Sequence, residues 1–220
     1  MKKVAILRSL VKFKPHVVHC VEHTPASTFC ASLAKSLDVP LVWSTHTNLD
    51  FYLPLYIHSL ASPLSLRVYQ LLRRTFLNLA DHNLTVSSAF ARHLHASGVG
   101  PHQSPPMHVW RTGVDSHAFR PALGSHQMRL RMFNGHYAPH KTLLVSVGRM
   151  SPEKNFEFLA ALLDRMSNDV FMCVVGDGPY RASLEPLFDA RHAHFIGLLE
   201  GDELASAYAS ADLFVYASVS

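Results

Sequence analysis

Short apolar runs rich in β-branched residues alternate along the chain with longer stretches in which apolar residues recur about every 3.6 positions. The short runs are typical of buried parallel strands, and the longer stretches are typical of helices. In the first half, strand patterns lie at residues 16–20, 41–44, 83–86 and 108–110, and helix patterns lie at 25–37, 63–79 and 88–96. This order predicts βαβ units around a parallel sheet.

A second series of the same kind begins after a stretch rich in Pro, Gly and His. Its strand patterns lie at residues 143–147, 171–175, 194–196 and 213–216, and its helix patterns lie at 156–166, 181–188 and 203–209. We therefore expect an α/β protein with two Rossmann-like halves, residues 1–112 and 142–220, joined by a linker at 113–141. A cleft between two such halves is the natural place for a ligand.

Both halves are expected to be incomplete. A doubly wound domain usually opens with a strand and a Gly-rich turn, whereas this chain opens with a helical pattern before its first strand. The chain also stops at Ser220, directly after a strand pattern. Because catalytic loops in such sheets lie beyond the carboxyl ends of the strands, we expect the last loop to be cut short and the natural N-terminus to lie upstream of Met1.

Composition narrows the class of protein. Hydrophobic residues make up 48% of the 220 residues, enough for a substantial core, and no run of about 18 apolar residues is present, so membrane contact is expected to be peripheral. The net charge of +4 is too weak and scattered for a nucleic-acid-binding surface, although it suits small anionic ligands. Cys20, Cys30 and Cys173 lack metal-ligand spacing and leave one thiol unpaired, which favours a reducing compartment over a disulfide framework.

The 16 histidines raise the question of a metal site. The local pairs are His93 with His95, His136 with His140, and His192 with His194. None of these pairs has a nearby carboxylate or cysteine at the spacing of a metal site. Scattered surface histidines are the better interpretation, and we expect no bound metal.

Two consecutive strand patterns end in glycine-containing turns that lead into helices. The first turn carries Gly148, Arg149 and Lys154, so backbone can approach a ligand where two cations stand beside an anion-favouring helix N-terminus. This arrangement fits a diphosphate cradle, and a solvated loop in which Lys154 pairs with a neighbouring Glu explains the spacing equally well. The second turn, with Gly176 and Asp177, taken alone indicates a turn and a helix cap, and no Gly-x-Gly-x-x-Gly fingerprint of a dehydrogenase occurs.

Together with Phe-Ile-Gly at 195–197 and Tyr-Ala-Ser-Ala-Asp at 208–212, these turns resemble the sugar-donor half of the retaining GT-B glycosyltransferases, the glycosyl transferases group 1 family. Phrases at 113–116, 125–131, 178–181 and 201–210 are similar to the branch of that family that synthesises sulfolipid. The resemblance implies a GT-B fold, with two Rossmann-like halves facing a cleft. It also implies a UDP-sugar as the donor substrate, with no metal or other cofactor.

The resemblance implies a sugar-donor site made of two groups of residues. The group that matches the diphosphate-holding part of the family consists of Gly148, Arg149 and Lys154. The group that would border the nucleoside and read a uracil edge consists of Gly176, Asp177, Ile196 and Gly197.

In the first half, His46 follows a strand end and matches the family's histidine near the reacting sugar carbon. Retention in the family is thought to need no covalent enzyme intermediate, so the implied catalytic role of His46 is to hold the sugar and shield developing charge. From the residues alone, an ordinary histidine satisfied at a strand end is the commoner explanation. Tyr52 and Tyr56 resemble the acceptor entrance of the same branch, and core packing explains them equally well.

The helix pattern at 63–79 combines an apolar stripe with arginines. The stripe consists of Leu64, Val68, Leu71, Leu72, Thr75, Phe76 and Leu79, and the arginines elsewhere on the helix are Arg67, Arg73 and Arg74. The simplest prediction is that the stripe covers a sheet, while the same amphipathicity also suits a surface of anionic lipid.

The function that the resemblance implies is transfer of a sugar, expected to be sulfoquinovose, from UDP to diacylglycerol with retention of configuration. The implied partners are a nucleotide sugar, a lipid acceptor and a membrane surface, with no nucleic acid. The implied location is a chloroplast or photosynthetic membrane, and since no transit segment is seen the alternative is the cytoplasm. The family's two sugar-gripping glutamates would follow Ser220, so an inactive truncated glycosyltransferase is an alternative function. Two further alternatives are a glycosyltransferase that acts on another lipid or a polysaccharide, and a sugar-nucleotide epimerase.

Overall fold

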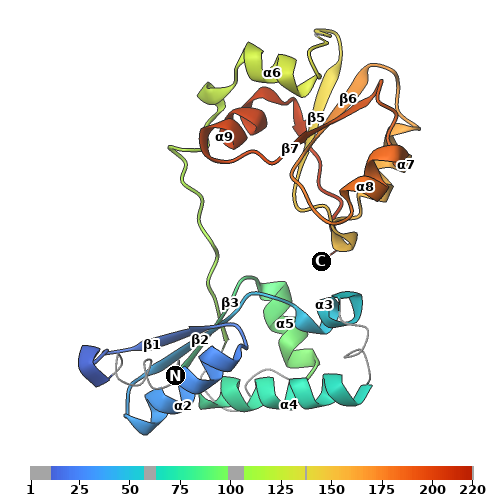
Figure 1. Cartoon of the computed structure of the whole chain (residues 1–220). Coiled ribbons are helices and arrows are strands. Elements are labelled where there is room, and N and C mark those ends of the chain that lie inside the picture. The colour runs from blue at the N-terminus through green and yellow to red at the C-terminus, as the bar shows by residue number, and fades with distance from the viewer. Residues whose placement is uncertain (1–10, 57–62, 99–106, 137, 220) are drawn as a thin grey trace. The chain divides into compact units, whose positions relative to one another are not determined.

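Two separate parallel sheets organise the chain, one in each of two units (Figure 1). The first unit is Met1–Gly113 and the second is Val114–Ser220. The computed structural model describes residues 11–56, 63–98, 107–136 and 138–219, without the side chains of 53–56 and 63. The helical pattern expected at the start of the chain falls mainly on residues 1–10, outside the described residues.

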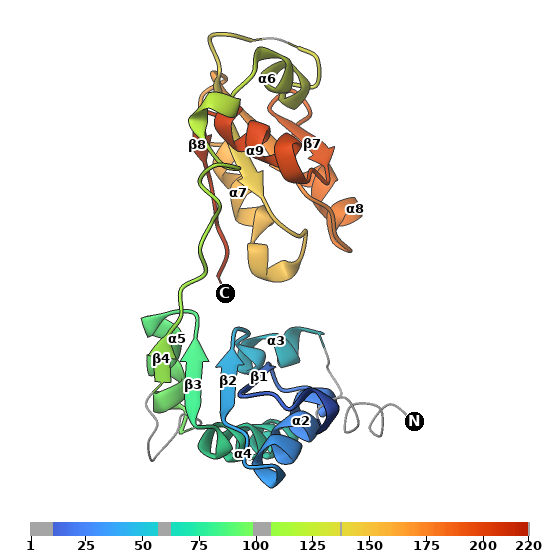
Figure 2. The same ribbon diagram turned by 90° about the vertical axis from the view of Figure 1, so that its left-hand side faces the viewer.

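Within the described part of the first unit, parallel strands form a sheet in the order β1-β2-β3-β4. The strands are β1 (Val18–Val21), β2 (Leu41–Thr45), β3 (His82–Thr85) and β4 (Met107–Val109). Because all the strands run the same way, their carboxyl ends share one edge of the sheet (Figure 2). That edge is where ligand-binding residues are expected in a sheet of this kind.

The described part of the first unit also contains helices. They are α2 (Pro25–Ser36), α3 (Leu49–Tyr56), α4 (Pro63–Leu79) and α5 (Ser88–Ala96). α2 begins where the Thr24 hydroxyl accepts a hydrogen bond from an N–H of the first turn, and Ser87 caps α5 in the same way. The core cluster draws on α2, α4, α5 and the strands: Cys20, Ala31, Ala34, Leu41, Trp43, Leu77, Ala80 and Leu94.

The buried side of α4 is not the apolar stripe that its pattern predicts. Leu64 is 72% exposed and Leu71 is 64% exposed, whereas Arg73 is fully buried. Arg73 Nη2 donates to Asp50 Oδ2 of α3 at 2.8 Å, so a charged pair occupies the inner side of the helix. The prediction that the stripe covers the sheet is therefore wrong for its outer part, while Phe76 packs against the core cluster.

The sheet of the second unit has a strand buried on both faces. In the described residues the order is β7-β6-β5-β8, all parallel. The strands are β5 (Thr142–Val147), β6 (Val170–Val175), β7 (Ala193–Gly197) and β8 (Leu213–Phe214). Every residue of β6 is buried, because alternate side chains enter two different hydrophobic clusters. This is typical of a strand between two layers of helices.

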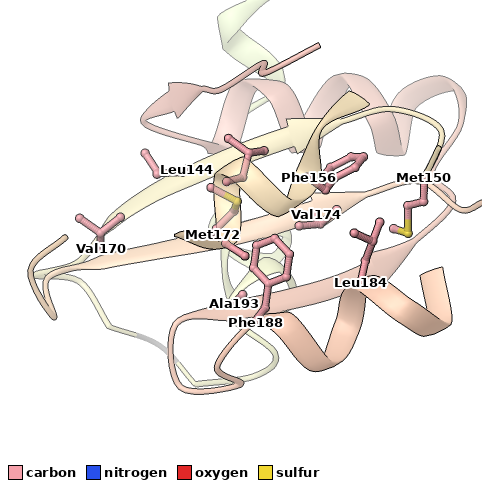
Figure 3. Packing of buried hydrophobic residues seen from close by; sticks show 11 residues of the cluster. Leu144, Met150, Phe156, Val170, Met172, Val174, Leu184, Phe188 and Ala193 are labelled. Atoms are coloured by element: carbon pink, nitrogen blue, oxygen red, sulfur yellow. The ribbon is translucent and has the colours of Figure 1, made fainter. Parts of the chain in front are cut away.

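Helices cover both faces of this second sheet. They are α6 (His126–Met132), α7 (Phe156–Leu163), α8 (Arg181–Leu184) and α9 (Gly201–Ser210). On one face, Val170, Met172 and Val174 pack with α7 and α8 (Figure 3). On the other, Phe171 and Cys173 pack with α6 and α9. The second unit is a doubly wound layer structure with its own core.

The strands and helices predicted from the sequence within the described residues are present, with differences at their ends. α8 ends four residues earlier than the predicted 181–188 and continues as the 3₁₀ turn Glu185–Leu187. Pro186 explains this, because proline has no N–H to donate and its ring clashes with the preceding helical turn. The segment expected to be a linker, 113–141, contains the 3₁₀ turn Pro121–Leu123 and α6, whose Met132 is buried in the second core.

Candidate functional site

Close backbone contacts join the loops that follow β5 and β6. At Gly176, where φ is +131°, an added Cβ would lie 2.1 Å from the carbonyl oxygen of Gly148, so no larger residue fits. An added Cβ at Gly178 would lie 2.4 Å from the carbonyl oxygen of Met150. The two loops therefore pack backbone against backbone at the carboxyl edge of the sheet.

Hydrogen bonds extend this contact to the end of β7. The N–H of Gly148 donates to the carbonyl of Val175 at 3.0 Å, and the N–H of Gly176 donates to the carbonyl of Gly197 at 2.8 Å. Between the two loops, the N–H of Met150 donates to the carbonyl of Asp177 at 3.0 Å. We call residues 148–150, 176–178 and 197 the glycine rim, because their backbones form one hydrogen-bonded edge.

A cavity of about 710 Å³ opens beside the glycine rim. Its lining consists of Val147, Gly148, Arg149, Val175, Gly176, Asp177, Gly178, Leu198, Leu199 and Leu204. Gly148, Arg149, Gly176 and Asp177, which the sequence predicts for the sugar-donor site, thus lie together on one cavity. Three other predicted residues, Lys154, Ile196 and Gly197, are outside its lining, although Gly197 is bonded to the rim.

The leucines of this lining are not predicted as site residues from the sequence. Leu198 is 67% exposed, and Leu199 and Leu204 pack with the cluster beneath α9. An apolar residue just after a strand has no motif of its own, so the sequence offers no signal for them. They give the cavity an apolar wall against which a flat ring can lie.

The two predicted cations occupy different surroundings. Arg149 is exposed, and among the described residues its side chain has no recorded hydrogen bond or ion pair. The side chain of Lys154 runs beside Gly148. The Cδ of Lys154 lies 4.0 Å from the position that a Cβ on that glycine would occupy. Its Nζ donates to the Tyr216 hydroxyl at 2.8 Å and lies 5.3 Å from the centre of that ring. A hydrogen bond from Lys154, and a second from Ser218, hold the pKa of Tyr216 below its ordinary value.

In the first unit, Glu22 holds the turn that carries His46. Glu22 follows β1 with a left-handed φ of +57°. Its Oε1 accepts hydrogen bonds from the N–H groups of His46 and Thr47, both at 2.6 Å, and its own N–H donates to the carbonyl of Ser44 at 3.0 Å. These bonds fix the backbone of His46 at the end of β2. No motif marks Glu22 in the sequence.

The imidazole of His46 belongs to a second hydrogen-bonded group. Ser44 Oγ lies 3.1 Å from His46 Nε2 and 2.9 Å from His19 Nε2. The Trp110 ring lies beside both imidazoles, with centroid distances of 5.8 Å to His19 and 6.3 Å to His46. His19 and Ser44 are not predicted as site residues, yet a polar residue inside an apolar strand pattern is a signal that can find both.

Near this group, His23 is a partly buried histidine that lies against the core residue Trp43. Its ring lies 4.6 Å from that of Trp43 between centroids, and neither ring nitrogen has a hydrogen-bond partner among the described residues. Burial, and after it the positive charge of Arg73, lowers the pKa of His23 to about 4. His23 is therefore neutral at pH 7 and contributes packing.

The two predicted acceptor-entrance tyrosines lie on α3. Tyr52 is half-buried, with its ring centroid 5.5 Å from that of Phe51. The side chain of Tyr56 lies outside the described part of the structure.

Two kinds of feature are absent from the described residues. These residues contain no group of three or more His, Cys, Asp or Glu side chains arranged to hold a metal ion. The same part of the chain has no helix that is both long enough and apolar enough to span a bilayer.

Both halves of the chain match known family models. Residues 2–118 match Glycosyltransferase Family 4, and residues 141–220 match Glycosyl transferases group 1. The fold is similar to that of Anabaena Alr3699/HepE, crystallised with UDP and glucose: the TM-score is 0.71 with 17% identity, covering 99% of this chain and 56% of that one. The expected α/β, GT-B type of fold with two Rossmann-like sheets is thereby confirmed.

Sequence relatives differ in the sugars and acceptors that their names carry. The chain is 36% identical to sulfoquinovosyl transferase SQD2 of Arabidopsis thaliana, over 98% of this chain and 40% of the relative. It is 34% identical to a GDP-mannose-dependent alpha-mannosyltransferase of Mycobacterium tuberculosis, over 96% of this chain and 51% of the relative. It is 29% identical to an alpha-monoglucosyldiacylglycerol synthase of Streptococcus pneumoniae, over 86% of this chain and 43% of the relative. The chain therefore spans about half of each relative's length.

Proposed function

Because the chain belongs to Glycosyltransferase Family 4, we propose that it carries the sugar-donor site of an enzyme that moves a hexose from a nucleotide to an acceptor. The observation that carries this proposal is the glycine rim. Its close-packed backbones leave room for a ligand beside Arg149, and Lys154 runs along the same edge. A nucleoside diphosphate needs such a surface: backbone for close approach, cations for its charge and an apolar wall for its base.

The proposed chemistry is electrostatic. In the proposed step the acceptor hydroxyl oxygen bonds to the sugar carbon as the bond to the diphosphate breaks, and the hydroxyl proton passes to the departing diphosphate. Negative charge grows on the leaving oxygen as that bond breaks. Arg149 and Lys154 then interact more strongly with the departing diphosphate than with the intact donor, which lowers the barrier. His46 holds the sugar and shields the reacting carbon. The configuration is retained without a covalent enzyme intermediate.

For the sugar donor we propose UDP-sulfoquinovose. The name of the Arabidopsis relative supports the sugar, and the UDP in the Anabaena structure supports the nucleotide. The mycobacterial relative, whose name specifies GDP-mannose, makes a guanine nucleotide the main competitor. No metal or other cofactor enters the proposed reaction.

For the acceptor we propose diacylglycerol at a membrane surface, as in the synthesis of sulfolipid in a chloroplast. The name of the Streptococcus relative supports this class of acceptor. So does the exposed side of α4, which carries Leu64, Val68, Leu71 and Leu72 beside the exposed Arg67 and Arg74. Apolar side chains next to arginines suit the boundary between acyl chains and anionic headgroups.

Calorimetric titration with UDP tests the sugar-donor site. We expect the parent chain to bind UDP and an R149A/K154A double variant to bind at least about tenfold more weakly, since each charge-assisted contact contributes about 1–3 kcal/mol. An R165A/K141A variant is the matched control, because it removes one arginine and one lysine from the same unit at positions that neither line the cavity nor lie in the two glycine-containing turns. Equal binding by all three chains would refute the proposed site.

The same titration with GDP and ADP tests the nucleoside. A clear preference for UDP supports the UDP-sugar proposal. A preference for GDP would instead favour a mannosyl donor while keeping the proposed site and reaction class.

A further inference from the structure

The hydroxyl of Ser44 lies between the imidazoles of His19 and His46, and we call these three residues the bridge. We propose that Ser44 and His19 are positioning residues, which hold the Nε2 edge of the His46 ring and so present its Nδ1 edge to a ligand. This inference rests on the proposed function only in taking that ligand to be the donor sugar.

The first step is the chemistry of the shared hydroxyl. Ser44 is fully buried, and its Oγ lies within hydrogen-bond distance of Nε2 on both imidazoles, at 2.9 Å and 3.1 Å. A serine hydroxyl has one proton to donate and lone pairs with which to accept. Since no other acceptor for its proton is recorded among the described residues, we expect the hydroxyl to donate to one Nε2 and to accept from the Nε2–H of the other. The two rings then hold opposite tautomers, and each depends on the other.

The second step is the scaffold around the bridge. β1 and β2 pair in parallel with Val21 opposite Ser44, which brings the strand carrying His19 beside the end of β2. Glu22 holds the backbone N–H of His46 at 2.6 Å, and Trp110 flanks both rings. The His46 ring is thus fixed at its backbone, at its Nε2 and along one side.

The third step concerns the Nδ1 edge of the His46 ring. Among the described residues, Nδ1 of His46 has no recorded hydrogen-bond partner, and the side chain is only half-buried. A polar atom in that position at the carboxyl edge of a parallel sheet is available to a ligand hydroxyl. The bridge also sets whether that Nδ1 donates or accepts, because it sets the tautomer.

Nitrogen NMR on the 220-residue chain tests the bridge without any ligand. Protonated and bare imidazole nitrogens resonate far apart, so long-range ¹H–¹⁵N spectra of histidine-labelled protein report each tautomer. The signals of His19 and His46 are identified by their loss in His19→Leu and His46→Asn. We expect opposite states at the two Nε2 atoms. His19 is exposed, so His19→Leu leaves the fold intact while shifting the His46 nitrogens.

His19→Gln separates positioning from packing, because its amide reaches the place of the imidazole Nε2. We expect His19→Gln to keep the His46 nitrogens near their parent frequencies, and Ser44→Ala to shift them as His19→Leu does. If His46 keeps its parent spectrum in His19→Leu, or if both Nε2 atoms of the parent are in the same state, the bridge is not a positioning device and the proposal is overturned.

Spectra of a ligand complex test which edge of the His46 ring contacts the sugar. In a complex saturated with UDP-glucose, we expect the Nδ1 signal of His46 to move and its Nε2 signal to stay. Movement at Nε2 alone, or at neither nitrogen, would overturn the proposed orientation. Binding is followed separately by calorimetry, so failure to bind counts against the proposed function alone, and the ligand-free spectra still decide the bridge.

Discussion

At the scale of single residues, Tyr216 is the contact that orients Lys154 beside the glycine rim. Its hydroxyl accepts a hydrogen bond from Nζ at 2.8 Å, and the same ammonium group lies 5.3 Å from the centre of its ring. We expect Tyr216→Phe to weaken UDP binding by about fivefold in calorimetry, since loss of one such bond costs about 1 kcal/mol.

Tyr208→Phe is the control for that change, because Tyr208 lies on α9 against Phe214 and removal of its hydroxyl leaves the Lys154 contact in place. Tighter binding by Tyr216→Phe would mean that the tyrosine competes with the diphosphate for Lys154.

His23 makes the stability of the first unit depend on pH. Its pKa is about 4 in the folded chain and 6.5 ordinarily, so the unfolded chain binds the proton more readily. Stability is therefore complete above pH 6.5 and falls as the pH drops toward 4. Urea unfolding at pH 7 and pH 5 should show a loss of about 2 kcal/mol in the parent that His23→Phe reduces. An identical pH dependence in both chains would contradict a neutral, buried His23.

The sequence predicts a site residue when the features that define it are close by in the chain. The turns that carry Gly148, Arg149, Gly176 and Asp177 are predictable because each follows a strand pattern and precedes a helix pattern, and the family resemblance then assigns these residues to the sugar-donor site. Contacts such as His19 with Ser44, or Lys154 with Tyr216, join residues 25 and 62 positions apart. They depend on which strands become neighbours, and hydrophobic periodicity does not specify strand order.

At the scale of elements, α4 is held by a buried charge. Arg73 is fully buried and pairs with Asp50, which is also bonded to Gln70 of the same helix. We expect Arg73→Ala to destabilise the chain by about 3–5 kcal/mol in urea unfolding, since it leaves a largely buried carboxylate without its arginine and with only the longer contacts to Gln70 and His93.

Arg74→Ala provides the control on the next residue of the helix. Arg74 is exposed, so its loss should change stability by less than about 0.5 kcal/mol. Equal effects of the two substitutions would mean that the ion pair does not anchor α4.

The outer side of α4 gives a separate prediction about lipid. A Leu71→Gln, Leu72→Gln double variant should lose most sedimentation with vesicles containing anionic lipid, because it removes apolar area that would enter the interface. Its stability should change little, since both leucines are more than half exposed in the parent. Unchanged sedimentation would exclude this side of α4 as the contact.

Hydrophobic periodicity predicts whether a segment is a strand or a helix, but it does not always predict which face of that element is buried. Alternating strand and helix patterns predict β5, α7 and β6 because the cores on both sides of the second sheet demand them. For α4 the same logic fails. It assigns the leucines to the inside, and no periodicity rule anticipates that an arginine is buried there with a carboxylate supplied from another helix.

At the scale of the whole molecule, each unit has a core of its own. The clusters of the second sheet lie entirely within Val114–Ser220. We expect residues 114–220, produced alone, to show a cooperative thermal transition and to bind UDP with the affinity of the whole chain. Loss of binding by a folded fragment would show that the first unit contributes to the nucleotide site.

The cavity beside the glycine rim and the bridge around His46 lie in different units, which affects how such a protein can evolve. Every residue of the cavity lining comes from the second unit, and the whole bridge around His46 comes from the first. Substitutions in the cavity lining and substitutions at the bridge therefore fall in units that each have a core of their own. If the proposed function holds, the nucleotide and the sugar of one donor are recognised from separate cores, so selection can change one set of positions without repacking the core that carries the other.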